Sequence, residues 1–162
     1  MQRKRYCASR RSRGASAVEF ALIMPLFFLL LFGIVDFGWY FFNQHTIQYA
    51  TREGTRLALV GGTVKDVDNN DLSRVDSIVK TIKDNAAVAV NPADLRISIY
   101  PVGADYSDPP NWSTTLNAGS GGDYMRVRVL YTYNFFTPLI GDFFPSGMKE
   151  MRAESLYRNE NF

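Results

Sequence analysis

Residues 10–42 read RRSRGASAVEFALIMPLFFLLLFGIVDFGWYFF, a basic stretch followed at once by a long apolar segment. Residues 20–35 form an uninterrupted run of uncharged, mostly large apolar residues. Asp36 interrupts this run, and the mostly aromatic residues 37–42 continue it. A helix needs about 20 such residues to cross a bilayer. The run therefore predicts a membrane-spanning helix whose outer boundary falls within residues 36–42, where Trp39 and Tyr40 suit an interfacial aromatic belt.

Glu19 stands directly before this run. An isolated carboxylate costs roughly 2.5–3.5 kcal/mol at mid-membrane on insertion scales, and less near an interface. A positive charge supplied by processing would offset that cost. If the chain is cut after Gly14, the new amino group of Ala15 lies about one helical turn from Glu19, within the same subunit or in a neighbour. A basic leader cut after glycine, followed by a glutamate that the new amino group can neutralise, is typical of type IV pilin precursors.

Residues 14 to about 56 resemble the TadE-like family of tight-adherence (Tad/Flp) pilus proteins. The matching elements, in order, are Gly14, the core Val18-Glu19-Phe20-Ala21, Pro25, Phe32-Gly33, Asp36 and the tail Ala50, Arg52-Glu53, Arg56. Met151-Arg152-Ala153-Glu154 also looks like the end of such proteins. The resemblance covers about the first third of the chain.

The resemblance implies cleavage by a prepilin peptidase between Gly14 and Ala15. It further implies a minor pilin or pseudopilin role in building an adhesive pilus, with Glu19 and Phe20 serving subunit register and assembly. The implied partners are the peptidase, other pilins or pseudopilins, the pilus assembly platform and the lipid bilayer.

The net charge of +2 reports the N-terminal segment and not the rest of the chain. Residues 1–14 carry six of the 18 basic residues and no acid, so the remainder has 12 basic against 16 acidic residues, a net charge of −4. Nucleic-acid binding is therefore not expected. By the positive-inside rule, the basic cluster predicts a cytoplasmic N-terminus, a single membrane pass and an exported C-terminal domain. The resemblance implies that the membrane is the bacterial inner membrane.

Cys7 and His45 are the only cysteine and the only histidine. Without Cys7 the exported domain has no disulfide, no thiolate nucleophile and no cysteine metal site. His45 falls in a predicted helix, and no partner residues in the sequence make it a catalytic base. The sequence holds neither a phosphate-binding loop nor a nucleophile-elbow motif. We expect no enzyme activity, no cofactor and no metal site.

Two alternatives concern the membrane segment. A cleavable secretory signal peptide fits poorly, because it needs a cleavage site of small residues after the apolar run. The small residues Ala15-Ser16-Ala17 precede the run, and no such cleavage site follows it. An uncleaved signal anchor is the serious rival to processing. Pro25 permits either a static kink or local melting of the helix when subunits pack, since proline removes one backbone hydrogen bond.

The helical pattern continues past the membrane to about residue 60, where Gly61-Gly62 predicts the end. Continuous from residue 15, such a helix is about 70 Å long at ~1.5 Å per residue. Small residues recur every four positions and allow close packing on the chain's own domain, the default, or between subunits: Thr46, Ala50, Gly54 and Ala58.

A polar loop at residues 65–71 begins like a calcium-binding loop, but Asp71 stands where that loop needs glycine and Ser77 where it needs glutamate. A solvated loop is the simpler interpretation, and Ser73 with Asp76 resembles a helix capping box. A second helix follows, because apolar residues recur at helical spacing at Leu72, Val75, Ile78, Val79, Ile82 and Ala86. Asn91-Pro92 stops it.

Alternating patterns predict three strands, near residues 95–100, 125–135 and 149–157. One face of the second strand is apolar and the other carries Arg126, Arg128 and Thr132, which predicts a sheet with one covered face. The expected fold class is α+β and pilin-like: a long N-terminal transmembrane and stalk helix, a second helix, and a small antiparallel sheet of about three strands.

The two connections between the predicted strands are longer than a simple turn needs. Residues 102–122 are rich in Gly, Pro, Asp and Ser, and we expect a variable surface loop in which Tyr106 and Trp112 offer a partner surface. Residues 138–147 are unusually apolar, and we expect them to cover an open edge of the sheet. For either segment, contact with another pilus component or cover of a sheet edge is an open alternative.

The resulting organisation is a cleaved basic leader at residues 1–14, a transmembrane helix at 15–42, and an extracytoplasmic α+β head at 43–162. The expected function is that of a minor pilin or pseudopilin of a Tad-type (type IVc) pilus, acting in pilus assembly and surface adhesion. The alternative is an uncleaved, signal-anchored envelope binding module whose ligand surface is the loop around Trp112.

Overall fold

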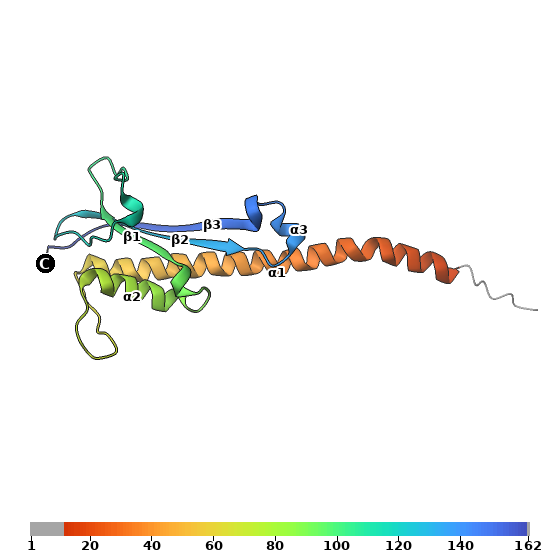
Figure 1. Cartoon of the computed structure of the whole chain (residues 1–162), viewed down its shortest axis with the longest axis horizontal. Helices are drawn as coiled ribbons and strands as arrows, with labels where there is room; N and C mark the ends of the chain where they lie inside the picture. The colour runs from red at the N-terminus through yellow and green to blue at the C-terminus, as the bar shows by residue number, and fades with distance from the viewer. Residues whose placement is uncertain (1–11, 162) are drawn as a thin grey trace, which may run out of the picture.

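The computed structural model describes residues 12–161. It contains three helices, α1 (Ser12–Leu59), α2 (Arg74–Ala86) and the short α3 (Pro138–Gly141), and three strands, β1 (Arg96–Pro101), β2 (Tyr124–Asn134) and β3 (Met148–Arg158). Helix α1 runs the length of the molecule, and its N-terminal half projects away from the other elements (Figure 1). The fold class is α+β, as the sequence predicted.

The C-terminal end of α1 is set by two glycines. Gly61 adopts a left-handed φ of 67°, its N–H donates to Ala58 O (3.1 Å), and the N–H of Gly62 donates to Leu57 O (3.1 Å). These two bonds form a Schellman motif, which satisfies carbonyls that the helix leaves open. The helix therefore ends where the glycine pair predicted.

Helix α2 begins at a side-chain cap and packs along α1. Ser73 Oγ accepts a hydrogen bond from Asp76 N (3.1 Å) and donates one to Asp76 Oδ2 (2.6 Å). Ile78 and Ile82 of α2 are fully buried. The guanidinium of Arg74 donates to Ala58 O (3.1 Å), so α2 also caps the last turn of α1.

The sheet is antiparallel in the order β1-β2-β3. The pairs Ile99↔Val127 and Val129↔Ala153 place apolar side chains opposite one another on the face that meets α1 and α2. The core formed there consists of Ile47, Ala50, Ala58, Ile78, Ile82, Ala86, Val90, Leu95, Ile99, Ala118, Met125, Val127, Val129, Tyr133, Met151, Ala153 and Tyr157.

The second face of the sheet is also covered in part, contrary to the expectation of a sheet with one covered face. Residues 102–122 fold back over it, and Arg128, expected on the open face, is only 1% exposed. The same segment covers the free edge of β1, because Ile99 N donates to Thr115 O (2.9 Å) and Asn117 N donates to Ile99 O (2.8 Å). Most residues of this segment are exposed, as expected of a surface loop, but it also covers a sheet edge, which was the alternative interpretation.

Residues 138–147 do not cover a sheet edge, so that expectation is wrong too. They form the turn between β2 and β3, built from α3 and a 3-10 turn at Pro145–Gly147. Two of their apolar side chains turn inward: Ile140 Cδ1 lies 3.7 Å from the position of a Cβ at Gly33, and the ring of Phe144 stacks on Phe135 with centroids 4.3 Å apart.

Candidate membrane and assembly surface

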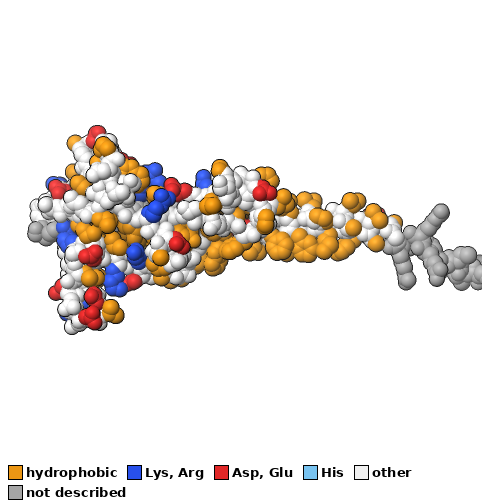
Figure 2. Space-filling model, in the orientation of Figure 1, with side chains coloured by type: hydrophobic (Ala, Val, Ile, Leu, Met, Phe, Trp, Pro, Cys, Tyr) orange, Lys and Arg blue, Asp and Glu red, His pale blue; other side chains and the backbone are white. Residues whose placement is uncertain are grey.

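The projecting half of α1 presents apolar side chains on all sides. Among the described residues it is the one helix long and apolar enough to cross a membrane, and none of its most apolar window is buried. Figure 2 shows apolar side chains along this half, whereas charged side chains gather on the head. A core helix of a water-soluble domain would bury such residues. This surface therefore requires lipid or other helices around it.

The predicted processing residues lie at the beginning of α1. Gly14, Ala15 and Glu19 are exposed, and no heavy atom lies within 4 Å of a Cβ placed at Gly14. Ala15 and Glu19 are four residues apart in the helix and so share a face. Phe20 is 65% exposed. Most of the predicted leader, including Cys7, lies outside the described residues.

Helix α1 continues unbroken through Pro25. Proline has no N–H to donate to the carbonyl four residues earlier, so one bond of the helical ladder is missing there. A static kink and local melting on assembly both remain open for this position.

Asp36 joins the membrane helix to the head. Its side chain is 1% exposed. Its Oδ1 accepts hydrogen bonds from Tyr133 Oη (3.1 Å) and Phe136 N (3.1 Å), and its Oδ2 accepts one from Thr137 N (2.9 Å). Burial raises the pKa of Tyr133, and its hydrogen bond to Asp36 raises it further, so this phenol remains a donor.

Aromatic rings surround this junction. Tyr40 lies edge-on to Tyr133 (centroids 5.5 Å apart) and stacks on Phe135 (6.0 Å), while Phe37 meets Phe135 edge-on (5.9 Å). No contact or role of Asp36 was predicted from the sequence. The available signal was a lone carboxylate within an apolar helix, a residue type that is costly there unless partners are provided.

The stripe of small residues lies mainly against α2. Ala50, Gly54 and Ala58 are buried, and Thr46 is half-buried. A Cβ at Gly54 would stand 2.4 Å from Ile82 Cγ1, so only glycine permits this approach of the two helices. In the isolated chain the stripe therefore packs within the subunit.

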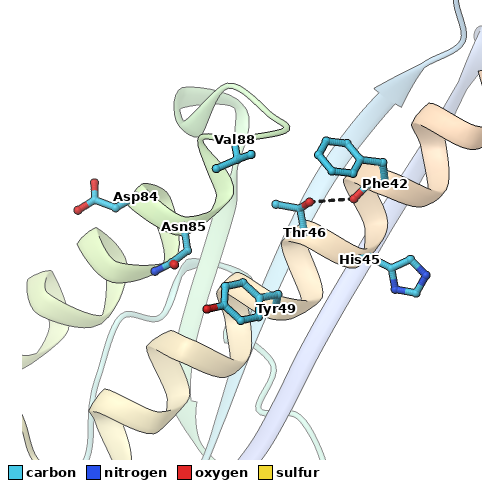
Figure 3. A pocket seen from close by; sticks show the side chains of 7 residues that line it. All are labelled: Phe42, His45, Thr46, Tyr49, Asp84, Asn85 and Val88. Atoms are coloured by element: carbon cyan, nitrogen blue, oxygen red, sulfur yellow. Dashed lines mark hydrogen bonds between the residues drawn. The ribbon is translucent and has the colours of Figure 1, made fainter.

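A shallow groove of about 440 Å³ runs between α1 and α2 beyond this stripe. It is lined by Phe42, His45, Thr46, Tyr49, Asp84, Asn85 and Val88 (Figure 3). Its only carboxylate, Asp84, already pairs with Lys80 (2.8 Å), and His45 points away from α2. This arrangement offers a mostly apolar contact surface and brings no base to a nucleophile.

Trp112 and Tyr106, the predicted partner surface, occupy different environments. Trp112 is half-buried and covers the guanidinium of Arg128, whose Cζ lies 4.2 Å from the ring centroid. Arg128 also binds Glu154 Oε2 through Nε (3.1 Å) and Nη2 (3.0 Å), and Asp108 Oδ2 through Nη2 (2.7 Å). Tyr106 is 44% exposed, with its ring edge-on to Tyr124.

The ion pairs around Arg128 lower the pKa values of the two acids that form them, Asp108 and Glu154. Burial alone would raise the pKa of Asp108, but hydrogen bonds from Tyr100 and Arg128, with the charges of Arg128 and Arg126, lower it. Burial likewise opposes ionisation of Glu154, yet hydrogen bonds from Arg152 and Arg128 lower its pKa. The acids are thus held ionised as structural partners of Arg128.

Within residues 12–161, no three His, Cys, Asp or Glu side chains gather in a way that could hold a metal ion. The acidic loop before α2 makes internal hydrogen bonds: Asp68 N donates to Asp66 Oδ1 (2.7 Å), and the backbones of Lys65 and Asp71 form an isolated antiparallel β-bridge.

The fold and this surface define a class, an α+β protein whose exposed N-terminal helix is suited to a membrane. Residues 14–56 match the family model of TadE-like proteins, which confirms the resemblance over that segment. The match begins at Gly14 and ends near the end of α1. Together with the apolar half of α1, the match supports a membrane-anchored protein associated with a Tad pilus. Comparisons with curated proteins and with solved structures give no match.

Proposed function

We propose that the chain is a minor pilin or pseudopilin of a bacterial Tad-type pilus. A prepilin peptidase removes residues 1–14, which leaves residues 15–42 as the transmembrane helix and residues 43–162 as the extracytoplasmic head. The subunit then rests in the inner membrane and joins other pilins or pseudopilins at the assembly platform, where it supports pilus assembly and surface adhesion. Its role is structural and needs no catalysis or cofactor.

One observation carries this proposal: the TadE-like match begins at Gly14, on the helix whose apolar side chains are exposed in the isolated chain. Helices of neighbouring subunits are the natural cover for that surface once a subunit leaves the bilayer. Glu19 is the only acid on α1 before Asp36, and a carboxylate among packed apolar helices needs a cation. The amino group of Ala15, created by cleavage, supplies one.

Substitution of Glu19 tests the proposal. We expect Glu19→Ala to be cleaved normally and to fail in pilus assembly, because the register contact with an Ala15 amine is lost. Glu19→Asp retains the charge and should retain part of the assembly. Electrophoretic mobility reports cleavage, and microscopy of surface pili in the native host reports assembly. Normal piliation by Glu19→Ala would sink the register role.

A further inference from the structure

The turn between β2 and β3, here called the hairpin tip (residues 135–147), exposes large apolar side chains. Phe136 is 68% exposed, Leu139 53% and Phe143 79%. Large apolar side chains that gather on a surface usually mark a contact with lipid or another protein. The position of the tip along α1 decides which contact this is.

The tip lies at the level where α1 leaves the hydrocarbon. It approaches α1 at Gly33, where Ile140 Cδ1 lies 3.7 Å from the position of a Cβ, and it contacts Asp36 through the backbone of residues 136 and 137. If Glu19 lies at the inner boundary, a hydrocarbon core about 30 Å thick is crossed in ~20 residues at ~1.5 Å per residue. The outer boundary then falls near Trp39, so residues 33–36 lie just inside it.

The contacts of Asp36 point the same way. A carboxylate at this depth is costly in lipid, and the tip supplies two of its three donors, the N–H groups of Phe136 and Thr137. The head thus reaches down to the membrane to enclose Asp36. Asp142, exposed beside Phe143, limits the depth, because its carboxylate belongs among headgroups and not among acyl chains.

We propose that the hairpin tip is a second membrane contact, with Phe136, Leu139 and Phe143 inserted at the headgroup–acyl boundary of the outer leaflet beside α1. Its occupant is phospholipid, since the tip continues the lipid-facing surface of the membrane helix. Aromatic and aliphatic side chains with a nearby charge are suited to that boundary. The contact would hold the head at a fixed tilt on the bilayer. The inference rests only on the membrane anchorage of the proposed function and not on its pilus role.

Depth-dependent fluorescence quenching tests this contact in the full chain. Cys7 is the only cysteine, so a Cys7→Ser background accepts one label at Phe143→Cys or, separately, at Leu139→Cys. Val67→Cys is the matched control, because Val67 is fully exposed on the loop before α2, far from the tip (Figure 1). Each protein carries an environment-sensitive nitrobenzoxadiazole label and is placed as one chain per phosphatidylcholine–phosphatidylglycerol nanodisc.

We expect labels at positions 139 and 143 to be quenched at least twofold more than the label at 67 by lipids with a shallow nitroxide, and several-fold less by aqueous iodide. Equal quenching at 67 and 143 would overturn the proposal. Protection from iodide that develops only with two or more chains per disc would also overturn it, and would assign the tip to a second copy. The nanodiscs contain no pilus component, so failure here leaves the proposed function standing, and failure of processing leaves this test intact.

Discussion

At the scale of single residues, Asp36 shows how a charge is tolerated inside an apolar helix. Three donors from β2 and the hairpin tip meet its two oxygens, and the side chain is enclosed. Such a carboxylate fixes the head to the membrane helix more specifically than apolar contact does, because hydrogen bonds have direction.

Replacement of Asp36 should therefore destabilise the head. Asp36→Ala leaves two backbone N–H groups without acceptors, and we expect a loss of about 2–4 kcal/mol in the free energy of unfolding. Tyr133→Phe removes one donor and leaves the others paired, so it should lose only about 1 kcal/mol. Urea unfolding in detergent micelles, followed by circular dichroism, measures both. Equal stability of Asp36→Ala and the parent protein would contradict this role.

Trp112 offers a second residue-scale prediction. Because its ring covers Arg128, we expect Trp112→Ala to lose about 2 kcal/mol, the value of a desolvated cation–π contact, and to make residues 102–122 sensitive to protease. Tyr106→Ala is the matched control on the same loop, with an expected change of about 0.5 kcal/mol for a surface position. If Trp112 serves only as a partner surface, the two variants will be equally stable.

The sequence could not foresee these two sites, for a physical reason. Asp36 meets residues about 100 positions away, and Trp112 covers an arginine on a different element. Neither contact produces a local periodicity. Arg128 alternates correctly for a solvent-facing position, and only the returning loop makes that position buried. The charge at Asp36 and the tryptophan in a polar loop were visible signals, but their partners were not.

At the scale of elements, the sequence was more informative. Helical spacing predicted α2, alternation predicted all three strands, and the glycine pair predicted the end of α1, because each signal is local. The contacts of the two long connections were predicted only in part. Residues 102–122 cover the edge and outer face of the sheet, while residues 138–147 reach the membrane helix, and such placement depends on the whole fold.

The packing of α1 on α2 provides a prediction at this scale. Gly54→Ala places a methyl group 2.4 Å from Ile82 Cγ1, and we expect a loss of about 1–3 kcal/mol from overpacking. Thermal unfolding monitored by circular dichroism measures it.

Two variants control for this result. Gly38→Ala, on the same helix, meets no atom within 4 Å and should be neutral or stabilising by up to about 1 kcal/mol from helix propensity. Ile82→Ala combined with Gly54→Ala should cost less than the sum of the single changes, because the smaller side chain removes the clash. Strict additivity would argue against a direct contact.

At the scale of the whole molecule, ionisable groups define a pH range of stability. The pKa values of Asp108 and Glu154 are lowered in the folded chain by their arginine partners, so the unfolded chain takes up protons first and stability falls as the pH drops below about 4.5. Burial raises the pKa of Tyr100 and of Tyr157 to about 12. The unfolded chain then loses protons first, and stability also falls as the pH rises from about 10 to 12.

We therefore expect a plateau of stability between about pH 4.5 and 10, measured as the midpoint of urea unfolding in detergent across pH. Tyr157→Phe should weaken the alkaline decline, because the phenol that resists ionisation is absent. An alkaline decline unchanged in that variant would show that Tyr157 does not contribute.

The whole molecule also bears on the proposal that this chain is cleaved after Gly14 and assembles with other pilus subunits. A long exposed helix, a compact head and the junction at Asp36 suit a protein that rests in a membrane and later packs among similar helices. An uncleaved signal anchor would share the fold but would retain the basic residues before Gly14.

The most direct test is the N-terminal sequence of the protein extracted from the membranes of its native host. If a prepilin peptidase cuts after Gly14, as proposed, the mature chain begins Ala15-Ser16-Ala17-Val18-Glu19. A chain that begins upstream of Gly14 and retains Arg10 to Arg13 would contradict it. The protein would then be a permanently anchored envelope module.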